Sequence, residues 1–322
     1  MKENFWIKLK KPIFALAPMD DVTDAPFRAM IQKYGKPDVM WTEFISADGL
    51  VNSVGRKALE RKLIFSKKEK PIVAQLFGAN PENVKTASKF VAELGFDGID
   101  INMGCPDRKI EKIGAGASLI KNPELAKEII AKVKEGVPDL PVSVKTRIGY
   151  KSESEFENWI NELLSANPAV ITIHLRTRNE MSKVPAKFEF LKKAVQIRDK
   201  SKSKTLIIGN GDILNRKQGE KIAKQTGADG VMIGRGFFGK PWLLSKRFKK
   251  EPTPKKKLQI LLEHTKLFEK TFKAKNKFAV MKKHFKSYCS GFRGAKEIRV
   301  ELMGTVNSKE VKKVVDKYLK KM

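Results

Sequence analysis

Only two cysteines, Cys105 and Cys289, occur among the 322 residues of this chain. Two thiols make no disulfide framework, and no CxxC or HExxH spacing is present, so we expect no metal site. The sequence also lacks any apolar run of about 18 residues or more, and no apolar segment follows the lysines near its start. We therefore expect a cytosolic protein with neither a membrane span nor a secretory signal.

Acidic residues are scarce beside basic ones. The chain has 36 Asp and Glu against 66 Lys and Arg, a formal net charge of +30 and a pI near 10.0. Such an excess has two interpretations: a lysine-rich solvated surface, or a surface for a polyanionic partner. Residues 251–322 hold 20 Lys and Arg but 7 Asp and Glu. Because the excess is densest there, the distribution favours a nucleic-acid partner.

A GxGxxG motif is missing after the first apolar run, which counts against a Rossmann dinucleotide site. Instead, short Val/Ile-rich runs alternate with amphipathic helical patterns. The runs predict strands at 12–19, 39–45, 71–78, 98–104, 142–148, 170–175, 205–209 and 230–234. The intervening patterns predict helices at 24–35, 52–65, 80–95, 122–136, 154–167, 188–200, 216–227 and 241–248. At this length, eight alternations favour an α/β fold, a closed (β/α)8 TIM barrel, over a doubly wound open sheet.

The strand signal ends near two prolines, Pro252 and Pro254. Beyond them, helical patterns with basic outer faces cover 258–272, 278–287 and 308–319. We therefore predict two domains, a barrel of residues 1–250 and a small, basic, all-helical domain of residues 251–322.

The segment around Cys105 sits at the end of a predicted strand. Gly104 breaks the strand, and Pro106 restricts the backbone of Cys105. A lone cysteine is commonly a small buried hydrophobe. A core position, however, has no need for a thiol between two backbone-restricting residues. The setting indicates a thiol held on a rigid turn, with Asn102 two residues before it.

Polar groups follow the other predicted strands as well. Chemistry in a (β/α)8 barrel is placed at the C-terminal ends of the strands. The residues found there are Pro18, Met19, Glu43, Gln75, Asn102, Lys145, Arg147, His174, Arg176, Asn210, Gly211, Asp212, Gly234 and Arg235. A lysine or arginine at one strand end is ordinarily just solvated, but their joint occurrence indicates a functional site.

The residue types at these ends suit a flavin mononucleotide. Glycines at 209, 211, 234 and 236 would let backbone N–H groups approach a phosphate, with Arg235 as the countercharge. Lys145 suits the pyrimidine edge of a flavin, and Gln75 offers further hydrogen bonds. His174 could stack on the ring or hydrogen-bond to it. Spacing alone leaves another phosphorylated ligand open.

The chain resembles the tRNA-dihydrouridine synthases over nearly its whole length. The segments that carry the resemblance follow the family's order: 17–19 with 22–28, 75–78, 100–106, 144–149, 174–178, 209–212 and 229–236, and in the tail 281–284 with Tyr288, Gly291, Gly294 and Arg299. Three departures occur: Asp20-Asp21 stands where Ala-Gly is usual, Leu175 replaces a common glycine, and 179–188 lacks the usual tyrosine and tryptophan.

The resemblance implies an FMN-binding TIM barrel with a C-terminal helical tRNA-binding domain, NADPH or NADH as reductant, and no obligate protein partner. It implies FMN contacts from Pro18, Met19, Asp20, Gln75, Lys145, His174, Asn210, Gly211, Asp212, Gly234 and Arg235. It places Asn102, Arg147 and Arg178 near a flipped uridine, and it makes Cys105 the proton donor.

The implied reaction reduces the C5–C6 double bond of specific tRNA uridines to 5,6-dihydrouridine. Hydride from reduced FMN would reach C6, and a proton from Cys105 would reach C5. Two alternatives remain. An FMN barrel reductase of a small molecule, such as a dihydroorotate dehydrogenase, leaves the basic tail unexplained. A non-catalytic RNA-binding protein has no use for Cys105 among flavin-site residues.

Overall fold

The computed structural model describes residues 4–248, 250–273 and 278–320. Eight parallel strands form one sheet in the order β1-β8-β7-β6-β5-β4-β3-β2. They are β1 (Ile13–Leu16), β2 (Met40–Ser46), β3 (Ile72–Phe77), β4 (Gly98–Met103), β5 (Val142–Arg147), β6 (Val170–His174), β7 (Leu206–Asn210) and β8 (Gly230–Ile233). The two edge strands meet where Ala15 bridges Val39 and the N–H of Leu16 donates to the Val39 carbonyl at 3.0 Å. The predicted TIM barrel is confirmed.

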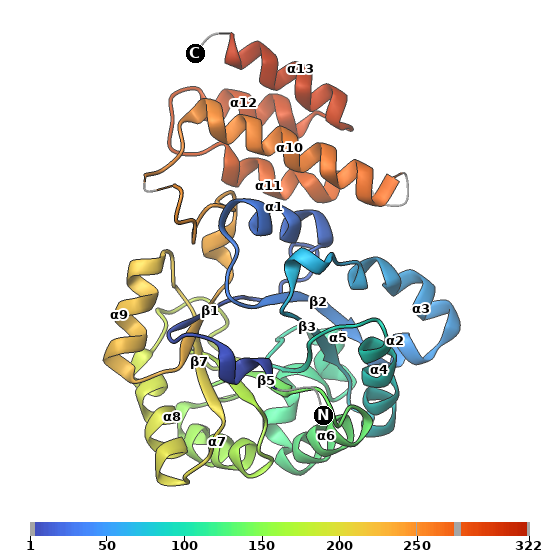
Figure 1. Ribbon diagram of the computed structural model, residues 1–322, viewed down its shortest axis with the longest axis vertical. Coiled ribbons are helices and arrows are strands. Elements are labelled where there is room, and N and C mark those ends of the chain that lie inside the picture. The colour runs from blue at the N-terminus through green and yellow to red at the C-terminus, as the bar shows by residue number, and fades with distance from the viewer. Residues whose placement is uncertain (1–3, 249, 274–277, 321–322) are drawn as a thin grey trace.

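Helices surround this ring of strands (Figure 1). They are α1 (Ala25–Gly35), α2 (Ala47–Val51), α3 (Ser53–Leu59), α4 (Pro81–Glu93), α5 (Arg108–Lys112), α6 (Pro123–Gly136), α7 (Phe156–Ser165), α8 (Phe188–Lys200) and α9 (Arg216–Thr226). Asn80 and Asn122 cap α4 and α6, each followed by proline at the first helical position. The loosely predicted helix at 52–65 is instead the short α3 followed by a 3-10 turn, Glu60–Leu63.

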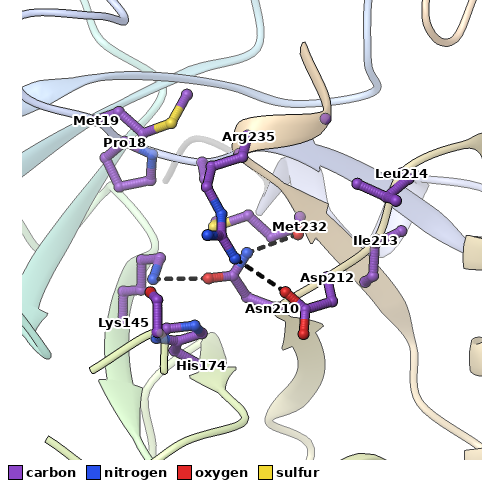
Figure 2. A pocket seen from close by; sticks show the side chains of 15 residues that line it. Pro18, Met19, Lys145, His174, Asn210, Asp212, Ile213, Leu214, Met232 and Arg235 are labelled. Atoms are coloured by element: carbon purple, nitrogen blue, oxygen red, sulfur yellow. Dashed lines mark hydrogen bonds and ion pairs between the residues drawn. The ribbon is translucent and has the colours of Figure 1, made fainter. Parts of the chain in front are cut away.

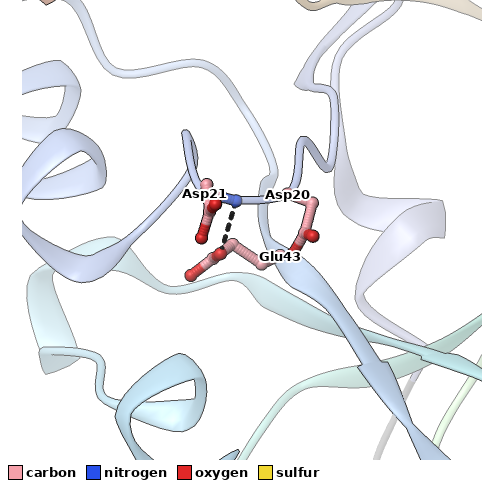
Figure 3. Close-up of side chains that lie close together, drawn as sticks. All are labelled: Asp20, Asp21 and Glu43. Carbon is pink, nitrogen blue, oxygen red and sulfur yellow. Dashed lines mark hydrogen bonds between the residues drawn. The ribbon is translucent and has the colours of Figure 1, made fainter. Parts of the chain in front are cut away.

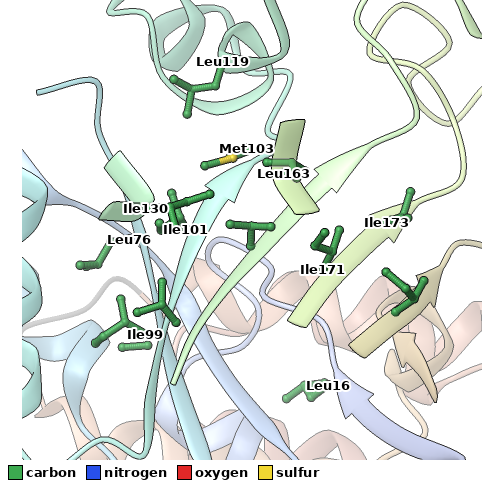
Figure 4. Packing of buried hydrophobic residues seen from close by; sticks show 14 of the residues in the cluster. Leu16, Leu76, Ile99, Ile101, Met103, Leu119, Ile130, Leu163, Ile171 and Ile173 are labelled. Carbon is green, nitrogen blue, oxygen red and sulfur yellow. The ribbon is translucent and has the colours of Figure 1, made fainter. Parts of the chain in front are cut away.

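Successive side chains along each strand point alternately outward and inward, so the strands contribute to two apolar layers. On β1, Phe14 and Leu16 face the helices, whereas Ile13 and Ala15 face the barrel interior. The outer layer is one continuous cluster of strand and helix side chains, part of which Figure 4 shows. The interior layer is closed at the N-terminal end by Trp6, whose ring lies 5.7 Å from that of Trp41. The N-terminal half of the barrel interior is therefore filled and apolar.

The helix predicted at 241–248 is wrong: the structure has turns there. Trp242 enters the core of the C-terminal helices, whereas Leu244 enters the core of the barrel. Neighbouring side chains that must reach two separate cores cannot share one helical face. The Ser245 hydroxyl then accepts from the N–H groups of Arg247 and Phe248 and closes a turn.

The C-terminal helices form a bundle beside α1 at one end of the molecule (Figure 1). They are α10 (Pro254–Phe272), α11 (Ala279–Tyr288), α12 (Ala295–Met303) and α13 (Ser308–Leu319). The bundle has its own buried cluster, which includes Met30 from α1. Helix α12 was not predicted, because its apolar positions are few and follow the irregular segment 289–294. None of the helices in the described ranges combines the length and apolar character needed to cross a lipid bilayer.

Candidate active site

Because strand side chains point alternately outward and inward, polar side chains near the strand ends face the interior of the barrel's C-terminal half. On β4, Ile99 and Ile101 pack toward the helices, so Asp100 and Asn102 face the interior. The same period places Gln75, Lys145, His174 and Asn210 at inward positions of their strands. The barrel interior therefore changes from apolar at one end to polar at the end where strands finish.

A cavity of about 270 Å³ opens at this polar end (Figure 2). Most of the residues predicted to bind a cofactor line it: Pro18, Met19, Lys145, His174, Asn210, Gly211, Asp212, Gly234 and Arg235. Ser182, Ile213, Leu214 and Met232 also line it and were not predicted. Ile213 and Leu214 continue the loop after β7, so the strand-end rule could have found them, whereas nothing in the pattern around Ser182 marks it.

Lys145 is the cation at the floor of the pocket. Its Nζ donates to Oδ1 of Asn210 at 3.2 Å, and the Asn210 amide donates to the Met232 carbonyl at 2.8 Å. Burial, with the nearby Arg147 charge, lowers the pKa of Lys145 to about 8, against the opposing effect of Asp100. An ammonium group has three N–H donors, so Lys145 can donate to an acceptor in the pocket.

Asp212 joins two cations on the pocket wall. Its carboxylate accepts from the buried Arg176, and its other oxygen accepts from Arg235 at 2.9 Å (Figure 2). The Arg235 side chain is 62% exposed, so most of its guanidinium remains available to a ligand. The pocket wall thus presents a tethered but accessible positive charge.

Of the glycines predicted to approach a phosphate, some line the pocket and one packs against a helix instead. Gly211 has φ of 129°, which disfavours any side chain, and a Cβ at Gly234 would lie 3.3 Å from both Ala17 and Met19. Both glycines line the pocket and keep backbone close to it. Gly209 differs from expectation, because a Cβ there would lie 2.4 Å from Leu191. It faces α8, so its role is close strand–helix packing.

Gln75 lies in a buried hydrogen-bond chain beside the pocket. Its Nε2 donates to Asp100 at 2.6 Å, and its Oε1 accepts from Asn102 Nδ2 at 2.9 Å. Asp100 also accepts from Ser143 at 2.5 Å, and burial raises its pKa to about 6. Both the nitrogen and the oxygen of the Gln75 side-chain amide therefore have hydrogen-bond partners within the protein.

Asn102 continues this chain into the turn that carries Cys105. Its Oδ1 accepts from the N–H groups of Gly104 at 3.1 Å and Cys105 at 2.9 Å. On the far side, the N–H of Ala117 donates to the Cys105 carbonyl at 2.9 Å. Cys105 is partly exposed, and burial raises the pKa of its thiol. Because its pKa is raised, the thiol carries its proton at neutral pH. The turn that bears it is held by hydrogen bonds on both sides.

The other predicted residues surround this turn rather than the pocket. Arg147 donates from Nε to the Gly104 carbonyl at 2.7 Å and from Nη1 to the Thr177 and Met181 carbonyls, both at 3.1 Å. Arg178 makes a bidentate ion pair with Glu111 of α5. Both arginines tie the loop after β6 to the loop that bears Cys105.

Asp20, predicted as a cofactor contact, lies on the rim. The carboxylate oxygens of Asp20, Asp21 and Glu43 lie within 4.8 Å of one another (Figure 3). The Lys62 ammonium pairs with Asp20 and lies 3.5 Å from Glu43, and the N–H of Asp21 donates to Glu43 at 2.7 Å. One lysine and one backbone donor thus compensate only part of the negative charge of the cluster.

A basic groove runs between α11 and α12. It is a hollow of about 600 Å³ lined by Lys282, Lys283, Lys286, Lys296, Arg299, Val300 and Met303. Within the described ranges, none of its five cations forms a salt bridge. Lys283 donates to the Asp21 carbonyl at 2.7 Å, so the groove adjoins the rim of the barrel mouth.

Fold and site together define a (β/α)8-barrel protein with a cation-lined pocket and a turn-held thiol at the same end. The family model described as Dihydrouridine synthase (Dus) matches residues 15–322. The chain belongs to the dihydrouridine synthase family.

Two curated relatives agree with this membership. A "Probable tRNA-dihydrouridine synthase 2" of Bacillus subtilis (strain 168) is 42% identical over 322 residues, covering 100% of this chain and 98% of the relative. A "Probable tRNA-dihydrouridine synthase" of Staphylococcus aureus (strain COL) is 42% identical over 319 residues, covering 99% and 96%.

Solved structures share the barrel at low identity. Histamine dehydrogenase from Rhizobium sp. 4-9 superposes with a TM-score of 0.57 at 14% identity, over 79% of this chain and 48% of that chain. A 2-naphthoyl-CoA reductase in complex with 2-naphthoyl-CoA gives 0.56 at 10% identity, over 73% and 49%. These likenesses concern the fold alone.

Proposed function

We propose that this protein reduces the C5–C6 double bond of specific uridines in tRNA to 5,6-dihydrouridine, with FMN as cofactor and NADPH or NADH as reductant. The observation that carries the proposal is a partly exposed thiol, Cys105, held on a fixed turn at the barrel end where the cation-lined pocket opens. The family and the names of both relatives support the substrate.

The pocket suits FMN by the chemistry of its donors. Lys145 and Arg235 supply positive charge, and Gly211 and Gly234 keep backbone close to the cavity. We propose that Arg235 and the loops after β7 and β8 hold the phosphate, and that Lys145, with His174, holds the ring edge. Pro18, Met19, Asn210 and Asp212 complete the wall, while Gln75 and Asp20 act from its border.

Reduced FMN, when bound, supplies the hydride that adds to C6 of uracil. Negative charge then gathers at C5 and O4, because the double bond is conjugated with the C4 carbonyl. Cys105 gives its thiol proton to C5. Burial raises the pKa of this thiol, so the proton is present at neutral pH. Asn102 orients the thiol through the backbone of its turn.

The arginines near the turn suit the uracil carbonyls. Arg147 uses Nε and Nη1 for backbone carbonyls, and Nη2 makes no hydrogen bond to the described residues. We assign Nη2 as a donor to the base. Arg178, paired with Glu111, holds the loop after β6 against α5 beside it.

Binding of tRNA is assigned to residues 251–322, and catalysis to residues 1–250. The base to be reduced must leave its stack to reach a barrel interior. The basic groove between α11 and α12 offers five cations to the phosphate backbone, close to the rim where the base would enter. The positive charge of the groove and its contact with the barrel rim support tRNA binding by the helical domain and catalysis by the barrel.

The direct test supplies the purified protein with FMN, NADPH and an unmodified tRNA transcript, followed by nucleoside mass spectrometry. We expect 5,6-dihydrouridine at one or a few positions, and none with free uridine. Flavin-loaded protein that oxidises NADPH yet leaves tRNA unreduced would contradict the proposal. Mapping dihydrouridine in tRNA from a strain without the gene would then identify the position modified.

A further inference from the structure

Arg176 is a buried cation behind the wall of the pocket, in contact with two lining residues, His174 and Asp212. Its side chain is 2% exposed. Nε donates to the Val184 carbonyl, Nη2 pairs with Asp212, and Nη1 lies 3.2 Å from Nε2 of His174. Every nitrogen of its guanidinium is thus directed at a specific partner, and one partner is an imidazole that lines the pocket.

The contact with His174 fixes where the imidazole carries its proton. A guanidinium has N–H donors and no acceptor, and it stays charged. Nη1 of Arg176 can therefore only donate, and Nε2 of His174 must be the unprotonated acceptor. A neutral ring with a bare Nε2 carries its hydrogen on Nδ1. Nδ1 has no hydrogen-bond partner within residues 4–248, 250–273 and 278–320.

The surrounding charges keep the ring neutral. Four cations act on it from three elements: Lys145 and Arg147 on β5, Arg176 beyond β6, and Arg235 after β8. The carboxylate of Asp212 is shared between two of these arginines. Burial and these charges hold the pKa of His174 well below its usual range.

We infer that Arg176 is a positioning residue that fixes His174 as the neutral, Nδ1-protonated tautomer, so that the ring offers the pocket an N–H donor. The ligand atom it recognises must be an acceptor, such as a carbonyl, a deprotonated ring nitrogen or a phosphate oxygen. His174 then supplies no proton in the reaction, which leaves Cys105 as the acid. Only the identity of the ligand rests on the proposed function.

The chain suits a direct test because it has three histidines, His174, His264 and His284. Imidazole ¹⁵N–¹H NMR of the purified protein separates the two tautomers and the imidazolium, and a His174→Gln variant assigns the His174 signals. We expect a protonated Nδ1, a bare Nε2, and no titration of His174 between pH 5 and 8. A proton on Nε2, or an imidazolium at pH 7, in the wild-type protein would overturn the inference.

Two variants test the part played by Arg176. Arg176→Met removes the donor, so we expect His174 to shift toward the Nε2-protonated tautomer and FMN affinity to fall about 2- to 10-fold, the value of one hydrogen bond. Arg176→Lys, which keeps a donor, should restore part of the wild-type signal. Arg198→Met, which removes an arginine paired with Asp229 outside the pocket, is the matched control and should leave the His174 signals unchanged.

An unchanged tautomer in a folded Arg176→Met protein would refute the positioning role. If Arg176→Met does not fold, the wild-type spectrum and Arg176→Lys still decide. A protein that never binds FMN would contradict the proposed function, yet the His174 signals could be read in the same sample. Failure of one claim is therefore distinguishable from failure of the other.

Discussion

The backbone N–H of Cys105 donates a 2.9 Å hydrogen bond to Oδ1 of Asn102. The same oxygen accepts from Gly104 at 3.1 Å, and the other end of the amide donates to Gln75 at 2.9 Å. The amide is thus locked in one orientation by a buried partner. The thiol is therefore held from inside the barrel by this amide, in addition to the bond from the Ala117 N–H to the Cys105 carbonyl on the far side.

Replacing Asn102 with alanine should therefore displace the thiol. A reacting group moved by about 1 Å can lose about 10²-fold in rate, and we expect a loss of roughly that size in tRNA reduction. FMN binding should persist, because Asn102 does not line the pocket. Single-turnover rates and flavin titrations measure both quantities.

The matched control is Asn80→Ala, which removes an asparagine that caps α4 away from the site. It should cost about 1 kcal/mol of stability without slowing the reaction. Equal rates in the Asn102→Ala and wild-type proteins would show that the turn holds without the amide.

Asp24 makes stability depend on pH in a defined direction. It caps α1 by accepting from the N–H of Phe27 at 2.9 Å, and burial raises its pKa to about 7. The folded protein keeps this proton between about pH 4 and 7, where the unfolded chain has lost it. Its contribution to stability is therefore complete below pH 4 and is lost as the pH rises to 7.

Asp24→Asn keeps the cap and removes the ionisation. We expect the variant to gain stability relative to wild type as the pH rises from 4 to 7, by up to about 1.4 kcal/mol per pH unit, with a plateau above pH 7. Chemical denaturation of both proteins at pH 4, 5.5, 7 and 8 measures the difference. Parallel stability curves would rule out a raised pKa at Asp24.

Strand positions and most of the pocket could be predicted because they depend on local rules. Short Val/Ile-rich runs marked all eight strands, and strand ends marked Lys145, His174 and Asn210. What Asp212 and Arg176 contact could not be predicted, since their ion pair joins loops 36 residues apart. The turns at 241–248 were missed for a similar reason: Trp242 is drawn to a core that forms only when the C-terminal helices pack.

Removing Asn210 should weaken FMN binding more than removing Arg235. Asn210→Ala deprives the Lys145 ammonium of its amide acceptor and the Met232 carbonyl of its donor, so we expect a loss of at least 10-fold in affinity. Arg235→Ala removes a largely exposed charge, and we expect a smaller loss. Flavin absorbance after dialysis against graded FMN measures both.

Arg216→Ala, on α9 and outside the pocket lining, serves as the control and should bind FMN with the wild-type flavin absorbance. A colourless wild-type protein after reconstitution with FMN would contradict the cofactor assignment.

The basic groove should govern affinity for tRNA. Lys286→Ala with Lys296→Ala removes two cations that form no salt bridge with the part of the chain that the structure describes. Binding should therefore weaken, and the slope of log affinity against log salt should fall by about 1 per lost phosphate contact. Lys312→Ala, which removes a lysine paired with Asp316 on α13, should change little. Filter binding at several salt concentrations separates these outcomes; equal slopes for all three proteins would place the tRNA elsewhere.

The central claim, that Cys105 is the acid, is tested most directly by reoxidation of reduced flavin with substrate tRNA in a single turnover of Cys105→Ala. That variant should fold, bind FMN and accept electrons from NADPH, because none of these steps uses the thiol. We expect reoxidation by tRNA to slow about 10²- to 10⁴-fold, and Cys105→Ser to be nearly as slow because a hydroxyl is a far weaker acid. A reoxidation rate in Cys105→Ala equal to that of wild type would contradict the claim.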